Sequence, residues 1–200
     1  MVDLQNDFCK GGSLAVPEGD EIILLANQLQ PYFKNVIATK DWHPKDHMSF
    51  AANHSGRKIG DVLVMNNMEQ ILWPIHCVQN TPGAELHKNW DTTLIQKFFL
   101  KGIDKNVDSY SAFFDNAHLR TTGLADYLLT MNIQDIYIMG LATDYCVRFS
   151  CMDAVHMGFN THIILDACRG VELKPGDVQN AINEMEEEGV KICYTKDIIR

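Results

Sequence analysis

The chain has 200 residues, 46% of them hydrophobic, which is enough for one sizeable core and too little for two comfortable ones. Its net charge of −9, with no basic cluster, argues against nucleic acid or an anionic membrane as a partner. No apolar run reaches the length of a membrane-spanning helix. We therefore expect one domain over residues 1–200, and the sequence leaves open whether it forms a homo-oligomer.

The cysteine pattern bears on the compartment. None of the cysteines forms a CxxC pair, and in a chain of this length their even number carries little weight. We expect reduced thiols in a cytoplasmic protein. Residues 1–20 have no charged region followed by an apolar core, so we expect no secretory signal in them. The six cysteines are Cys9, Cys77, Cys146, Cys151, Cys168 and Cys193.

The first quarter of the chain predicts two strands and a helix. Met1–Leu4 resembles the end of an apolar strand, and we expect further residues ahead of it. Apolar residues recur at helical spacing over 22–29, where Asp20 is the expected N-cap and Pro31 marks the end. Val36–Thr39 is β-branched and apolar, which predicts a second strand.

The middle of the chain is mostly irregular. From His43 to Asp91 the periodicity is poor, and so long an irregular segment usually forms a binding or active-site loop. Ile95–Leu100 predicts a third strand. A second irregular stretch covers Asp104–Asn116.

Strands and helices alternate in the last third. The pattern predicts an α/β fold of three layers, α/β/α, with a mostly parallel six-stranded, Rossmann-like sheet covered on both faces. The predicted elements are a helical face over 124–131, a strand over Ile136–Met139, a helix from Thr143 to Gly158, a strand over Thr161–Asp166, a helix over Val178–Glu188 and a strand over Val190–Tyr194.

Cys146 is a candidate nucleophile. With Thr143 as N-cap, the cysteine lies in the first helical turn, where free N–H groups and the helix dipole lower a thiol pKa and can hold an oxyanion. The alternative is that Cys146 is a small core residue, since free cysteines are often buried.

Polar residues end the predicted strands. Asp3, Asp41, Lys101 and Cys146 follow strands one to four, and ligands of such sheets bind beyond the carboxyl ends of the strands. Each could be an ordinary surface residue. If they converge, Asp3 is placed to accept the thiol proton and Lys101 to keep Asp3 ionised.

A metal site is the second candidate. Asp41 and His43 are two residues apart and point the same way in an extended backbone. With His47 and His76 they offer one carboxylate and three imidazoles, a set that suits a divalent transition metal such as zinc, iron or manganese. The alternative is that these are ordinary loop histidines.

Five segments resemble the nicotinamidase/pyrazinamidase branch of the isochorismatase-like cysteine hydrolases. They occur in the family's order and span the chain. The segments are Val-Asp-Leu-Gln-Asn-Asp-Phe-Cys at 2–9, Thr-Lys-Asp-Trp-His-Pro at 39–44, Trp-Pro-Ile-His-Cys at 73–77, Phe-Leu-Lys-Gly at 99–102, and Gly-Leu-Ala-Thr-Asp-Tyr-Cys-Val at 140–147.

The resemblance implies an activity: hydrolysis of nicotinamide to nicotinate and ammonia through a thioester, in NAD salvage, with pyrazinamide as a further substrate. It implies a cis peptide bond before Ala142. The implied roles are a catalytic triad of Asp3, Lys101 and Cys146, metal ligation by Asp41, His43, His47 and His76, an oxyanion hole at Ala142 and Cys146, and ring contacts from Phe8, Trp73 and Tyr110.

Two features depart from the family pattern. Only two residues precede Asp3, where members carry several apolar ones, and Tyr145 stands where other members carry His. The alternatives are another cysteine amidohydrolase of the same fold and a non-catalytic protein that binds a pyridine or a metal.

Overall fold

The computed structural model describes residues 1–65 and 68–199, and it has the predicted α/β architecture. Two parallel sheets form its centre, with strand orders β1-β4 and β5-β6-β7. The strands are β1 (Val36–Asp41), β4 (Ile95–Lys101), β5 (Asp135–Leu141), β6 (Asn160–Arg169) and β7 (Lys191–Cys193).

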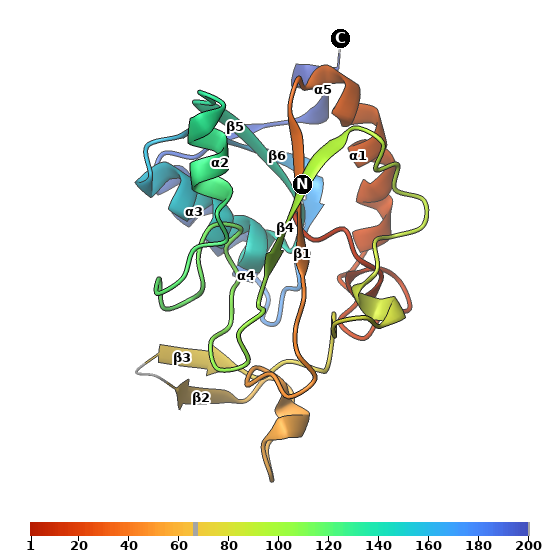
Figure 1. The fold of residues 1–200 in the computed structure, drawn as a ribbon, viewed down its shortest axis with the longest axis vertical. Coiled ribbons are helices and arrows are strands. Elements are labelled where there is room, and N and C mark those ends of the chain that lie inside the picture. The colour runs from red at the N-terminus through yellow and green to blue at the C-terminus, as the bar shows by residue number, and fades with distance from the viewer. Residues whose placement is uncertain (66–67, 200) are drawn as a thin grey trace.

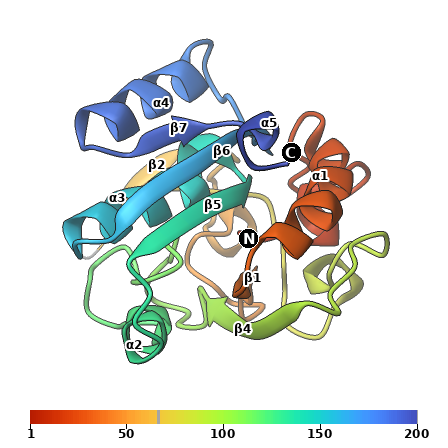
Figure 2. The ribbon, with the colours of Figure 1, turned by 90° about the horizontal axis from the view of Figure 1, so that it is seen from above.

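The N-terminal segment joins the two sheets. Val2 N–H donates to Met139 O at 2.8 Å and Leu141 N–H to Val2 O at 3.0 Å, while Thr39 N–H donates to Met1 O at 3.0 Å. The N-terminus therefore lies between β5 and β1 (Figure 2). Because this segment makes only one bridge, Val2 to Gly140, the predicted six-strand sheet is five strands linked by a short extended segment.

Gly140 makes this close approach feasible. A Cβ on Gly140 would lie 2.2 Å from Val2 O, and its φ of +134° is one that side chains disfavour. Only glycine therefore lets residues 1–3 lie directly against β5.

Helices cover the sheet on both sides, as the three-layer prediction requires (Figure 1). α1 and α5 lie on one side, and α2, α3 and α4 on the other. Asp20 does not cap α1 as predicted, because a 3₁₀ turn at Gly19–Glu21 precedes the helix. The helices are α1 (Ile22–Leu29), α2 (Leu124–Thr130), α3 (Arg148–His156), α4 (Asp177–Glu187) and α5 (Thr195–Ile198).

The segment predicted to be irregular contains a hairpin. β2 (Val62–Met65) pairs antiparallel with β3 (Met68–Ile71), away from the central sheet (Figure 1). β2 is apolar throughout, although Val62 and Val64 are 51% and 74% exposed. Its sequence therefore lacks the alternation of apolar and polar residues that marks a half-exposed strand. The prediction missed the hairpin for this reason. In the described part of the chain no helix has the length and apolar character needed to cross a bilayer.

Candidate active site and metal centre

The strands deliver the candidate residues to one edge of the molecule. Asp41 and Lys101 are the last residues of β1 and β4, and they stand opposite each other in the register of these strands. Asp3 follows the segment that bridges the sheets, and Cys146 comes five residues after β5. Parallel strands bring their carboxyl ends to the same edge, so these residues meet.

Lys101 lies at the centre of this group. Its Nζ is 2.9 Å from Asp3 Oδ2, 2.5 Å from Asp41 Oδ1 and 3.3 Å from Cys146 Sγ, and it donates to Ser109 O at 3.0 Å. The lysine is only 1% exposed. Burial alone lowers its pKa, but the Asp3 and Asp41 carboxylates outweigh burial and raise it well above its ordinary value. Lys101 is therefore a permanent ammonium.

Cys146 lies in a π-helical turn at Thr143–Val147, ahead of α3. The predicted cap at Thr143 is wrong, since Ala142 is the residue before this turn and α3 begins only at Arg148. The predicted fall in the thiol pKa is also wrong: burial raises it well above its ordinary value, although Lys101 acts in the opposite direction. The sulfur is therefore a neutral thiol that needs a base.

Asp3 is placed to be that base. Burial raises the pKa of Asp3, while Lys101 opposes the rise. Thr39 Oγ1 donates to Asp3 Oδ1 at 2.7 Å and orients the carboxylate. The side-chain donor atoms of Asp3, Asp41 and Cys146 lie within 4.8 Å of one another. A raised pKa makes a carboxylate a stronger base towards a thiol.

The turn before Cys146 offers a backbone donor. The Leu141–Ala142 peptide bond is cis. Ala142 O accepts the N–H groups of Tyr145 and Val147 at 3.1 and 3.0 Å, which holds the turn in place. Within residues 1–65 and 68–199, the Ala142 N–H has no hydrogen-bond acceptor. A free N–H beside the thiol can donate a hydrogen bond to an oxyanion.

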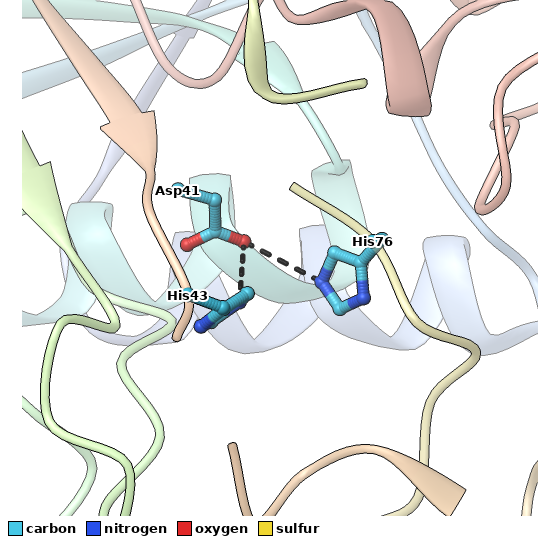
Figure 3. Close-up of side chains that lie close together, drawn as sticks. All are labelled: Asp41, His43 and His76. Atoms are coloured by element: carbon cyan, nitrogen blue, oxygen red, sulfur yellow. Dashed lines mark ion pairs between the residues drawn. The ribbon is translucent and has the colours of Figure 1, made fainter. Parts of the chain in front are cut away.

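The four predicted metal ligands are all buried, and His43 links them. His43 Nε2 and His76 Nε2 lie 3.3 and 3.6 Å from Asp41 Oδ2 (Figure 3). His47 is grouped instead with His43 and Asp108, whose donor atoms lie within 4.8 Å of one another. Asp41, His43 and His76 thus form one compact group, and His47 joins it through His43.

The environment of the histidines fits a metal. Their Nδ1 atoms are engaged by protein oxygens: His43 by Gly102 O at 2.9 Å, His76 by Pro74 O at 2.8 Å and His47 by Ser49 Oγ at 2.7 Å. Such outer contacts orient a ligating imidazole.

The Nε2 atom of His47 is buried and has no hydrogen-bond partner in the described structure. Burial and the neighbouring His43 lower the pKa of His47 to about 4, so this ring is neutral. A neutral ring with a free, buried nitrogen is the ligating form, and the set suits a divalent transition metal.

A pocket opens over the thiol. The three residues predicted to contact a ring, Phe8, Trp73 and Tyr110, line it together with Cys146 and Ala142. Trp73 Nε1 donates to the Tyr110 hydroxyl at 2.9 Å, which fixes both rings.

Two further residues line the pocket: Tyr145, which departs from the family pattern in the sequence, and Asp108, for which no role was predicted. Tyr145 packs edge-on against Trp73, with ring centroids 4.8 Å apart. Asp108 is a buried carboxylate beside His43 and His47. The only feature of the sequence that pointed to Asp108 was its position two residues before Tyr110, in an irregular stretch.

Known proteins resemble this chain along its whole length. The family model for the isochorismatase domain matches residues 1–197. The nicotinamidase of Escherichia coli K12 is 45% identical over 201 residues, covering 98% of this chain and 94% of the relative.

Solved structures agree. A nicotinamidase/pyrazinamidase of Acinetobacter baumanii superposes with a TM-score of 0.96 at 43% identity, covering 98% of this chain and 94% of that one. A pyrazinamidase of Pyrococcus horikoshii in complex with zinc superposes with a TM-score of 0.78 at 36% identity, covering 97% and 96%. With its α/β fold and its buried cysteine, lysine and aspartate, the chain belongs to the isochorismatase family.

Proposed function

We propose that this chain is a nicotinamidase: it hydrolyses the carboxamide of nicotinamide to nicotinate and ammonia. The observation that carries the proposal is Lys101 Nζ within 3.3 Å of the Cys146 sulfur and 2.9 Å of the Asp3 carboxylate, beside a group of metal-ligand type. The nicotinamidase relative at 45% identity supports the substrate. The first step needs a nucleophile, a base and an oxyanion donor, and the site offers all three.

The reaction begins with Asp3 taking the proton of the Cys146 thiol as the sulfur attacks the carboxamide carbon. The carbonyl oxygen becomes an oxyanion, which the main-chain N–H groups of Ala142 and Cys146 receive. Loss of one such donor typically costs on the order of a hundredfold or more in rate. Asp3 then gives its proton to the departing nitrogen, which leaves as ammonia, and a thioester to Cys146 remains.

Water completes the cycle. Asp3, now a carboxylate again, takes a proton from a water molecule that attacks the thioester carbon. The tetrahedral intermediate collapses to nicotinic acid, which loses its proton to solvent as nicotinate, and the sulfur regains its proton from Asp3. Lys101 stays charged throughout and limits the electrostatic cost of the buried anions around it.

Asp41, His43, His47 and His76 would hold a divalent cation. Such a cation, when bound, supplies a Lewis-acid anchor for the pyridine nitrogen. Phe8, Trp73 and Tyr110 contact the ring faces and edges, which keeps the carboxamide over the sulfur. Positioning of this kind can supply about 7 kcal/mol at best. The zinc-bound pyrazinamidase relative supports zinc, and iron and manganese remain alternatives for the same ligand set.

The rest of the proposal concerns context. We propose that the chain also deamidates pyrazinamide, that it acts in NAD salvage in the cytoplasm as a single domain over residues 1–200, and that its partners include neither nucleic acid nor a membrane. Self-association is compatible with the net charge of −9 but is not required by it.

The test is ammonia release from nicotinamide by the purified protein, before and after prolonged treatment with a chelator, alongside elemental analysis. We expect release that chelation abolishes and that added metal restores. No release under any metal would refute the function. Ammonia release that chelation does not change would support the amidase activity and contradict the proposed role of the metal.

A further inference from the structure

Asp108 is a buried carboxylate close to the metal-ligand group, and none of the proposed catalytic steps uses it. It is 3% exposed and lines the pocket with Asp41 and His76. Its donor atom lies within 4.8 Å of those of His43 and His47. It comes from the irregular stretch after β4, a different part of the chain from the predicted ligands.

The partners of Asp108 are neutral. Gln70 Nε2 donates to Oδ2 at 3.0 Å and the Ser109 N–H to Oδ1 at 2.8 Å. In residues 1–65 and 68–199, no lysine or arginine forms an ion pair with Asp108. Two hydrogen bonds orient the carboxylate and leave lone pairs on both oxygens. They do not balance its charge, and an unbalanced buried charge is costly.

The sum of the buried charges in the site shows what could balance the charge of Asp108. Asp3, Asp41, Asp108 and Lys101 are all at most 4% exposed. Three carboxylates against one ammonium leave two negative charges, and a histidine that ligates a metal does so as a neutral ring. One divalent cation brings this sum to zero. Without Asp108, the same cation would leave one uncompensated positive charge in the interior.

We infer that Asp108 is a second carboxylate of the metal centre, acting on the side of His43 and His47, and that its charge is what matches the site to a divalent cation. The inference rests on the metal site of the proposed function. It predicts that the metal-free protein carries a repulsion that the loaded protein does not.

The experiment measures Zn²⁺ affinity of the full-length protein by competition with a chromophoric chelator, and the thermal midpoint of the metal-free form. Asp108→Asn should weaken Zn²⁺ binding about 10- to 100-fold, as for other residues that support a ligand set. The metal-free variant should melt at the same temperature as the parent or higher, because a buried like charge is gone. Asp108→Ser, which removes the charge in a smaller side chain, guards against a variant that fails to fold.

Asp153→Asn is the matched control. Asp153 is also buried, at 7% exposed, but it lies in α3 and outside the metal-ligand groups, so Zn²⁺ affinity should not change. Zn²⁺ affinities of both Asp108 variants within twofold of the parent would overturn the inference, and a lower melting temperature alone would mark Asp108 as merely structural. If the parent binds no Zn²⁺, Mn²⁺ or Fe²⁺, the metal site itself fails as well. If the parent binds Zn²⁺ tightly and the Asp108 variants bind it equally well, Asp108 is not part of the metal centre, and the metal site of the proposed function stands.

Discussion

Lys101 forms buried ion pairs with two carboxylates, those of Asp3 and Asp41. Its side chain and that of Asp3 are fully buried, and Asp41 is 5% exposed. We expect Lys101→Met to destabilise the metal-free protein by about 3–5 kcal/mol, because the change leaves buried like charges unpaired. Urea unfolding measures it.

The matched control is Lys105→Met. Lys105 also pairs with an aspartate, Asp46, but both side chains are more than half exposed, so its loss should leave the unfolding midpoint unchanged. Equal effects of the two substitutions would contradict the role of Lys101.

Cys146 is the residue on which turnover depends. We expect Cys146→Ala to lower nicotinamide turnover by at least about 10⁴-fold, as removal of a nucleophile does elsewhere, while nicotinamide still binds. Ammonia release and calorimetric binding measure the two effects. Cys151→Ala is the control: this cysteine is also buried, but it lies in α3 outside the pocket, so activity should persist. Residual turnover near the parent's would exclude Cys146 from the chemistry.

In a polypeptide that begins at Met1, the amino group of the N-terminal segment makes stability depend on pH. The Met1 amino group donates to Ile37 O at 2.9 Å, and burial lowers its pKa from 8.0 to about 6, against the opposing charge of Asp3. Between pH 6 and 8 this group therefore binds more protons in the unfolded chain than in the folded one, and its contribution to the free energy of unfolding rises with pH.

In a polypeptide that begins at Met1, this rise should be about 2 kcal/mol over that range. Urea unfolding at pH 6 and pH 8 measures it. An N-terminally acetylated sample carries no such charge and should lack this contribution. The same slope in both samples would show that the amino group is not the source.

The same segment borders a cavity of about 380 Å³ between the amino ends of β1 and β5. Val36, Ile37, Ile136 and Ile138 are among its lining residues, which makes its wall largely apolar. We expect a short apolar extension ahead of Met1 to fill this cavity as an added strand and to raise the melting temperature by several degrees. A polar extension of equal length should not, and equal melting temperatures for both would refute the idea.

At the scale of the molecule, the metal site connects segments far apart in the chain. Asp41 is the last residue of β1, His43 and His47 follow the strand, and His76 comes after the hairpin of β2 and β3. A cation that binds only the folded chain stabilises it, by about 2.7 kcal/mol at a concentration one hundred times its dissociation constant.

We therefore expect added Zn²⁺ to raise the melting temperature and a chelator to lower it. In His76→Ala this response should be much smaller. In His118→Ala, where a histidine with a 59% exposed side chain is changed, it should be intact. An unchanged response in His76→Ala would exclude this histidine from the site.

Much of the fold could be predicted because local patterns of apolar residues determine the helices and strands. Apolar runs and helical spacing predicted β1, β4, β5, β6 and β7 and helices α1, α2 and α4 near their observed bounds, while α3 begins only at Arg148 and not at Thr143. The hairpin of β2 and β3 escaped prediction, since its first strand is apolar on exposed positions. The identity and order of the site residues also came from the sequence, through the family resemblance.

The sequence by itself therefore determined the α/β class, the family and the residue types available for chemistry. Only the tertiary structure decided that burial raises the pKa of the Cys146 thiol, that the cysteine lies in a π-helical turn, and that Asp108 lies beside His43 and His47. The reason is physical. A pKa and a charge balance depend on burial and on neighbours that are distant in the chain, and these exist only once the strands have brought their ends together.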